Sequence, residues 1–192
     1  MGSHEVLRNS SADDWLSYTI NSDDQIIATS GNWDHFAVSN GASELVGDRI
    51  RGGSFWNHIY GSTLLIVYRE LLRCVRSGKH LQFDFRCDSA HERRFMHLSM
   101  CGFADGSVRF ETHSLRIEQR DELTFDLISN ESRDEMIVMC SWCKKVCTGQ
   151  NSWDELESAI EKLRILERSV PPGITHGLCW SCYKKAMTSI AD

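Results

Sequence analysis

The segment HLQFDFRCDSAHERRFMHLSMCGFADGSVRFETHSLR, residues 80–116, contains runs in which apolar and polar side chains alternate. This period is typical of strands that bury one face and expose the other. Asp105-Gly106, between the second run and the third, is a strong signal for a β-hairpin turn. The segment therefore predicts three strands, over residues 80–87, 93–102 and 107–116. The apolar side chains that alternate along the first two strands are Leu81, Phe83, Phe85, Met96, Leu98 and Met100.

Two further strands are expected near the beginning of the chain. Residues 15–20 and 25–29 are short runs rich in β-prone side chains. The sequence Asn21-Ser22-Asp23-Asp24 between them suits a tight turn, because these side chains can hydrogen-bond their own backbone. The two runs therefore predict a hairpin.

Helical patterns lie between the hairpin and the three-strand segment. Short helices are expected over residues 33–38 and 42–46. Ser62 is expected to cap a longer helix that ends at Gly78, because apolar side chains recur between them at spacings of three and four. Residues 14–116 thus predict an α+β unit with a five-stranded antiparallel sheet and short helices.

The overall composition is that of a compact soluble protein. The 192 residues are 41% apolar and 25% charged, which excludes collagen, coiled-coil arrays and wholesale disorder. No window approaches the run of about eighteen apolar residues that a bilayer crossing needs, and the first residues do not resemble a secretion signal. We therefore expect a cytoplasmic protein with no membrane partner. Residues 1–13 are assigned to an N-terminal extension, in which Gly2-Ser3-His4 resembles a tag remnant.

Charge and cysteine are both unevenly distributed. The formal net charge is −6, from 21 basic and 27 acidic side chains. Residues 140–192 carry seven basic and six acidic side chains, which leaves a net charge of −7 on residues 1–139. This balance argues against a surface built mainly to hold phosphate backbones. Five of the eight cysteines lie in the last 53 residues, and this clustering favours a metal site.

The first unit resembles a PAS domain. The resemblance rests on three stretches: INSDDQIIATSGNWDHFAVSNGA (residues 20–42), GSFWNHIYG (53–61) and FDFRCDSAHERRFMHLSM (83–100). It implies sensing through a cavity between the sheet and the long helix, homodimerisation through PAS surfaces and a protein signalling partner. The expected lining is Tyr68 with the six alternating apolar residues of the two strands; the alternative is that these side chains fill an ordinary core.

The resemblance also raises the question of a chromophore. Light-sensing relatives carry an asparagine-cysteine-arginine-phenylalanine motif, which this sequence lacks, so a flavin is not expected. A haem would need an axial ligand such as His58, His80 or His97. Cys74 and Cys87 each lie beside an arginine that would favour a thiolate. The alternative is that both, together with Cys101, are small apolar core residues.

The second unit contains two C-x-x-C motifs. Cys140-Ser-Trp-Cys143 and Cys179-Trp-Ser-Cys182 are separated by 35 residues, a pattern in which each loop presents two thiolates to one tetrahedral cation. Four thiolates would complete the shell of a structural Zn²⁺, with backbone amides free to hydrogen-bond the sulfur atoms. A single iron, an iron–sulfur cluster, redox dithiols and unmetalled thiols are the alternatives. His176 and Cys147 are candidates for a supporting role or a replacement ligand.

The tail is expected to fold around this site. Residues 136–139 predict a short strand, and Ser152 with Glu155 fits a capping box for an amphipathic helix over 152–168. Residues 117–135 are charged and weakly periodic, so they are assigned to a linker or helical connector, and residues 136–192 to a four-cysteine zinc-binding module. The motif-bearing segment also resembles a short tail module of bacterial PAS and response-regulator proteins.

Three functions are open on this sequence. The favoured one is a non-enzymatic regulatory protein, because the chain shows no kinase, cyclase or P-loop signature and a full thiolate shell leaves no open metal position. The second is a transcription regulator whose tail binds nucleic acid. Lys144-Lys145 and Lys184-Lys185 follow the two motifs, and bases could stack on Trp142, Trp180 and Tyr183. The third is a metal enzyme or thiol oxidoreductase.

Overall fold

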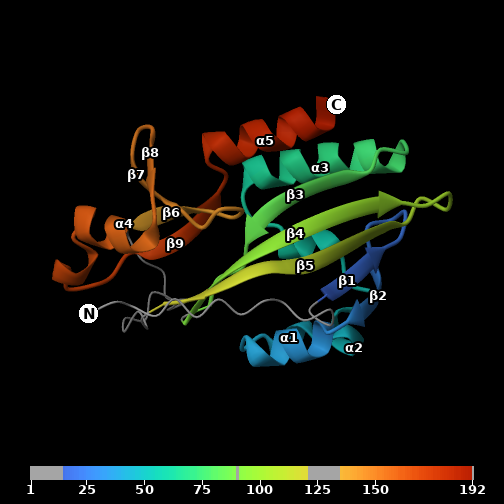
Figure 1. Cartoon of the computed structure of the whole chain (residues 1–192), viewed down its shortest axis with the longest axis horizontal. Helices are drawn as coiled ribbons and strands as arrows, with labels where there is room; N and C mark the ends of the chain where they lie inside the picture. Colours follow the sequence, from blue (N-terminus) through green and yellow to red (C-terminus); the bar gives the residue numbers. More distant parts are fainter. Residues whose placement is uncertain (1–14, 90, 121–134, 192) are drawn as a thin grey trace.

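The structure is a computed structural model that describes residues 15–89, 91–120 and 135–191. Its larger sheet has five antiparallel strands in the order β2-β1-β5-β4-β3 (Figure 1). The strands are β1 (Trp15–Ile20), β2 (Ile26–Gly31), β3 (Leu81–Arg86), β4 (Glu92–Gly102) and β5 (Val108–Gln119). The predicted α+β class and five-stranded antiparallel sheet are confirmed.

The turns between these strands follow the polar residues that predicted them. The Asn21 side-chain oxygen accepts hydrogen bonds from the backbone N–H groups of Asp23, at 3.0 Å, and Gln25, at 2.8 Å. At the β4–β5 turn the Asp105 carboxylate accepts a bond from the Ser107 N–H at 2.9 Å, and Gly106 takes a φ of +81°. Side chains that bond the local backbone fix both turns.

Helices connect β2 to β3. They are α1 (Trp33–Ser39), η1 (Ser43–Leu45), α2 (Gly47–Ile50), η2 (Phe55–His58) and α3 (Ser62–Arg76). The expectation that Ser62 caps the long helix is wrong, since Gly61 precedes the first helical residue and has a φ of +96°. A Cβ at Gly61 would lie 2.7 Å from the His176 carbonyl oxygen. Glycine is therefore required where α3 begins against the tail.

A second, smaller sheet forms the tail. Its strands, in the order β8-β7-β6-β9, are β6 (Met136–Cys140), β7 (Val146–Gly149), β8 (Ser152–Asp154) and β9 (Gly173–Gly177), and β6 pairs with β9 in parallel. The short strand predicted over residues 136–139 is confirmed. The helical elements of the tail are α4 (Leu156–Lys162), η3 (Ile165–Glu167) and α5 (Trp180–Ala191).

The single helix predicted over residues 152–168 is wrong. Ser152 does not cap a helix, because it lies in β8 and pairs with Gly149 of β7. The helix begins only at Leu156 and ends at Lys162, and Arg164 adopts a left-handed φ of +50° before η3. Leu156 and Ile160 are buried within the tail, whereas Leu166, expected on the same stripe, is exposed.

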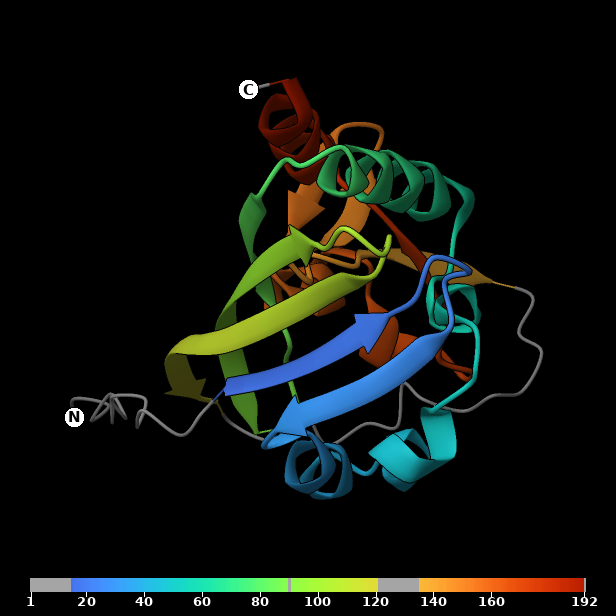
Figure 2. The ribbon, with the colours of Figure 1, turned by 90° about the vertical axis from the view of Figure 1, so that its right-hand side faces the viewer.

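The tail packs directly on the larger sheet and its long helix. Figures 1 and 2 both show α5 lying along α3, and Lys79 donates a 2.6 Å hydrogen bond to the Ile190 carbonyl near the end of α5. One buried cluster contains side chains from both predicted units, among them Leu71 of α3, Phe83 of β3 and Trp142 and Cys182 of the tail. The two units therefore share a hydrophobic core.

Some expectations concern segments near or beyond the described residues. The N-terminal extension over 1–13 lies outside them, as does most of the 117–135 connector. The start of that connector belongs to β5, which pairs with β4 as far as Gln119 opposite Glu92. Within the described ranges, no helix has the length and apolar character needed to cross a membrane.

Candidate metal centre

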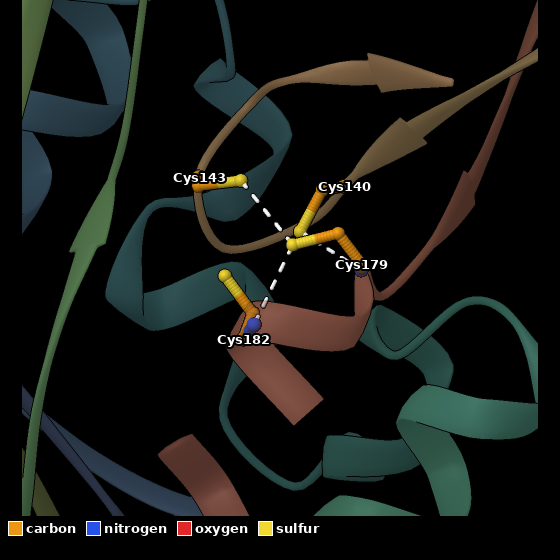
Figure 3. Close-up of side chains that lie close together, drawn as sticks. All are labelled: Cys140, Cys143, Cys179 and Cys182. Atoms are coloured by element: carbon orange, nitrogen blue, oxygen red, sulfur yellow. Dashed lines mark hydrogen bonds between the residues drawn. The ribbon is translucent and has the colours of Figure 1, made fainter. Parts of the chain in front are cut away.

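Four cysteine side chains converge where the tail meets the larger sheet. Cys140 ends β6, Cys143 lies in the turn before β7, Cys179 precedes α5 and Cys182 lies in its first turn. Their sulfur atoms all lie within 4.8 Å of one another, and those of Cys143 and Cys179 are 3.7 Å apart (Figure 3). A tetrahedron with Zn–S bonds of about 2.3 Å places its sulfurs ~3.8 Å apart. The predicted convergence is confirmed, and the geometry fits a tetrahedral metal ion.

The backbone of the first motif closes the turn that presents its two sulfurs. The Lys144 N–H donates to the Cys140 carbonyl at 2.9 Å, and the Cys140 N–H donates to the Lys145 carbonyl at 2.8 Å. Lys144 takes a φ of +60°, which reverses the chain after the motif. Ser141 is tied to the other motif's strand, because its N–H donates to the Gly177 carbonyl at 2.9 Å. Both motifs are thus held by one backbone network.

Backbone amides also contact the sulfur atoms. The Cys179 N–H lies 3.4 Å from the Cys140 sulfur, and the Cys182 N–H lies 3.4 Å from the Cys179 sulfur. Such N–H···S hydrogen bonds lower the charge that four thiolates would place on a metal ion. The expectation that amides would hydrogen-bond the ligand sulfurs is confirmed.

Hydrogen bonding among the thiols moves their pKa values apart. Hydrogen bonds from Cys143 and Cys182 lower the pKa of Cys140, because they stabilise its thiolate. The same contacts raise the pKa of Cys143 to about 12 and also raise the pKa of Cys182, since each would ionise beside an existing thiolate. A divalent cation would remove this repulsion and displace the remaining protons. The donor set therefore suits a metal better than four free thiols.

Trp142, within the first motif, is buried against the larger sheet. This side chain, 3% exposed, stacks on Phe83 of β3 with ring centroids 4.1 Å apart and planes 13° apart. The backbone carbonyl of Trp142 accepts a 2.6 Å hydrogen bond from the backbone N–H of Arg86, the last residue of β3. Cys140, Cys179 and Cys182 are buried, and Cys143 is half-buried. Trp142, one of the two residues between the cysteines of the first motif, therefore anchors the centre to the larger sheet.

The other two proposed ligands lie outside the sulfur cluster. Within the described residues, the candidate metal group contains the four cysteines and neither His176 nor Cys147. The side chain of His176 is exposed on β9, and desolvation together with the charge of Lys144 lowers its pKa. The Cys147 thiol donates to the Gly149 carbonyl at 3.2 Å.

A buried arginine joins the two units beside the centre. Arg86 is 8% exposed and forms two ion pairs. One is with Asp88, which follows β3, and the other is with Glu155, 2.5 Å away at the start of α4. Burial alone would lower the pKa of Arg86, but these two carboxylates together raise it. Arg93 forms a similar contact with Glu157 at 2.5 Å. The acidic start of α4 is therefore held by arginines of the larger sheet.

The larger sheet encloses a mostly apolar cavity of about 280 Å³. Of the seven residues expected to line it, Tyr68, Phe85, Met96 and Leu98 border this cavity. The other three do not: Leu81, Phe83 and Met100 are buried in the core, where Phe83 contacts Trp142. Alternation along one strand places all these residues on one face, but it does not distinguish packed positions from the wall of a cavity.

Most of the remaining cavity wall comes from β1, α1 and β5. It includes Leu16 and Tyr18 of β1, Trp33 and Phe36 of α1 and Thr112 of β5. The register brings Leu16, Thr112 and Leu98 into one row across three strands, so they face the same side. The alternating Leu16 and Tyr18 in the predicted hairpin were the sequence signal that could have identified part of this wall.

Among the described residues, no histidine borders this cavity. His58 and His80 are exposed, and His80 contacts the Ser99 hydroxyl at 2.7 Å. His97 contacts Asp84 at 2.7 Å on the neighbouring strand. None of the three histidines considered as axial haem ligands is placed to reach a molecule in the cavity.

The cysteines of the larger sheet occupy three different environments. Cys74 is buried in the core, Cys101 is exposed on β4, and Cys87 is half-buried and borders the cavity. The interpretation of all three as apolar core residues therefore fits Cys74 alone.

The comparisons with known proteins give no assignment. No protein-family model matches the chain, and no curated protein matches it. The resemblance of the first unit to PAS domains is therefore confirmed only at the level of a five-stranded antiparallel sheet in a mixed α+β fold.

Proposed function

We propose that this protein is a non-enzymatic regulatory protein, in which a PAS-like sensor unit is joined to a tail stabilised by a structural Zn²⁺. Cys140, Cys143, Cys179 and Cys182 would hold the ion. A complete thiolate shell leaves no position for substrate or water, which argues against metal catalysis. Paired C-x-x-C loops with amide donors are typical of structural zinc sites, so zinc is the proposed ion, and iron is the alternative that the same four thiolates could hold.

One observation carries the relay: Trp142 of the metal centre belongs to the hydrophobic cluster against which Tyr68 of the cavity wall packs. The Trp142 indole N–H is buried and forms no hydrogen bond with a described residue. Burial raises the pKa of Tyr68 to about 12, and the Trp142 indole opposes part of that rise. A molecule that moves Tyr68 would therefore disturb the residue that anchors the centre.

The remaining features of the proposal follow from the resemblance to PAS sensors. We propose a small-molecule ligand in the cavity, homodimerisation through the PAS-like unit and a protein partner that reads the tail, in the cytoplasm. Because the sequence carries no kinase, cyclase or P-loop signature, we propose that a change in the sensor unit leaves the molecule by contact with that partner.

Filling the cavity tests the relay without a known ligand. Ala42, half-buried, borders the cavity, so Ala42→Leu would occupy part of its volume. We expect this variant to change the rate of zinc transfer to a chromogenic chelator by about fivefold or more, as for two coupled sites. Val38→Leu, at a position that is 57% exposed on α1, is the matched control. Equal rates in both variants and the unchanged protein would contradict the relay.

Native mass spectrometry with elemental analysis tests the proposed metal, dimer and small-molecule ligand. One preparation should show one zinc per chain, paired chains and any retained small molecule. Iron in place of zinc would correct the metal assignment, and a chain free of metal would overturn the structural role of the four cysteines.

A nucleic-acid-binding tail is the second candidate, favoured by one surface feature. Trp180 is 70% exposed and stacks on Tyr183, with ring centroids 5.6 Å apart and planes 23° apart. Lys184 and Lys185 are exposed on the same helix. Aromatic side chains beside lysines can stack single-stranded bases and contact their phosphates.

A salt-titrated gel shift with random-sequence single-stranded DNA and RNA tests this candidate. If the tail binds, Trp180→Ala should weaken binding by about 5- to 100-fold, the range for losing one stacked base. Phe103→Ala removes another exposed aromatic ring, at the β4–β5 turn, and should leave binding unchanged. No shift at low salt would exclude this candidate.

A further inference from the structure

The thiol of Cys87 lies on the wall of the cavity in the larger sheet. Cys87 follows β3, is half-buried and is not part of a disulfide. Its backbone is fixed by Arg94 of β4: the Cys87 N–H donates to the Arg94 carbonyl at 2.9 Å, and its carbonyl accepts from the Arg94 side chain at 2.8 Å. A nucleophilic side chain is thus held at a fixed point of an apolar chamber.

An unpartnered hydroxyl faces the same cavity. Thr112 is 5% exposed and borders the cavity, and its hydroxyl forms no hydrogen bond with any described residue. A polar group of a ligand in the cavity would supply the hydrogen-bond partner that this side chain lacks among the described residues. Leu16 and Leu98 lie on either side of Thr112 across the sheet. At this row, the polar group of a ligand would therefore contact one hydroxyl between two apolar side chains.

Two phenols add further donors to this wall. Tyr18 and Tyr68 both border the cavity. Burial, and then the proximity of Tyr68, raise the pKa of Tyr18 well above its ordinary value, and burial also raises the pKa of Tyr68. Both hydroxyls therefore remain protonated at neutral pH and can donate hydrogen bonds. A carbonyl oxygen is the ligand group that such a set of donors favours.

We propose that the cavity captures small apolar molecules that carry an α,β-unsaturated carbonyl group, and that Cys87 forms a covalent adduct with them. This inference rests on the proposed function only in taking the cavity as the ligand site. The cavity volume of about 280 Å³ accommodates a small organic molecule, and the apolar wall disfavours polar electrophiles.

The reaction needs no oxidant or additional reactant. The Cys87 sulfur donates an electron pair to the β-carbon and forms a C–S bond, while the carbon–carbon π bond breaks and its electrons move toward the carbonyl oxygen. The oxygen gains negative charge, which hydroxyl donors such as Thr112 stabilise. The proton lost by the thiol ends on the α-carbon, and the product is a saturated thioether that retains its carbonyl.

The other cysteines of the larger sheet serve as internal comparisons. Cys101 is exposed on β4 and reports ordinary thiol reactivity in water, whereas Cys74 is buried in the core and should not react. An apolar enone should therefore prefer Cys87, and a small polar alkylating agent should prefer Cys101. Reactivity governed by exposure alone would favour Cys101 with both reagents.

The experiment uses the full-length protein loaded with zinc, treated separately with oct-3-en-2-one and with iodoacetamide. Peptide mapping measures the rate of modification at each cysteine, and Cys87→Ser and Cys101→Ser confirm the assignments. We expect the ratio of enone rate to iodoacetamide rate to be higher at Cys87 than at Cys101. Thr112→Val, which keeps the shape and removes the hydroxyl, should lower the enone rate at Cys87 by about fivefold and leave its iodoacetamide rate unchanged.

Two results would overturn the inference: an enone preference no greater at Cys87 than at Cys101, or equal loss of both rates at Cys87 in Thr112→Val. Zinc content measured on the same samples identifies any reaction that follows loss of the metal. If the adduct forms selectively at Cys87 and the modified protein transfers zinc to the chelator at the same rate as the unmodified protein, the relay is contradicted and the capture site is supported. The two proposals can therefore fail separately.

Discussion

Replacing Cys140 by serine is expected to abolish zinc binding and to unfold the larger sheet along with the tail. Apparent zinc-binding free energies of small structural zinc modules are about 10–16 kcal/mol, as large as the whole stability of a typical domain, about 5–15 kcal/mol. Cys140 is fully buried, and it shares its core cluster with Phe83 of the larger sheet and Leu71 of α3. Loss of the metal should therefore reach residues far from the tail in sequence.

The measurement combines elemental analysis with thermal unfolding followed by near-ultraviolet circular dichroism. Cys140→Ser should purify without zinc and without a cooperative transition, and a chelator should produce the same state in the unchanged protein until zinc is restored. Cys147→Ser is the matched control, because the Cys147 thiol contacts the Gly149 carbonyl and lies outside the sulfur cluster. A cooperative transition retained by metal-free Cys140→Ser would show that the sheet folds independently of the centre.

Local patterns in the sequence predicted most of the larger sheet. Alternation identified the strand faces, and Asn21 and Asp105 marked turns that their own side chains stabilise. The end of β5 was placed too early, at residue 116, because the strand continues through charged side chains in which alternation is hidden. Its pairing with β4, as in Arg93 opposite Glu118, extends it to Gln119.

The tail shows where local signals fail. Ser152 and Glu155 fit a capping box, but Ser152 pairs with Gly149 in a hairpin, and Thr148 and Ser152 both contact the Asp154 side chain. A pattern of four residues cannot show that a neighbouring strand competes for the same backbone. Tertiary pairing decided the structure of this segment, against its helical pattern.

Cysteine spacing predicted the four converging sulfurs, because two residues between ligands constrain both pairs locally. The packing of the centre on the larger sheet was not predictable in this way. The contact of Trp142 with Phe83 joins positions distant in the chain, and an apolar side chain within a C-x-x-C loop gives no indication of its partner. The role of Trp142 as an anchor therefore emerged only from the folded structure.

Arg86→Met is expected to lower the free energy of unfolding by about 3 kcal/mol, since removing one partner of a buried ion pair leaves a buried charge uncompensated. The carboxylate of Asp88 is 10% exposed and would lose its nearest cation, while Glu155 at the start of α4 would lose its contact with β3. Arg120 lies 3.9 Å from Asp88 and would replace part of the lost interaction, which places the expected loss at the lower end for such pairs.

Urea denaturation of zinc-loaded protein measures this loss, and Arg51→Met provides the control. Arg51 lies 3.8 Å from Asp48 in an ion pair whose side chains are 57% and 93% exposed, so the same substitution should cost less than about 1 kcal/mol there. Because Arg86 connects β3 to α4, we also expect faster zinc transfer to a chelator in Arg86→Met than in Arg51→Met. Equal stabilities of the two variants would show that the buried arginine does not hold the tail to the sheet.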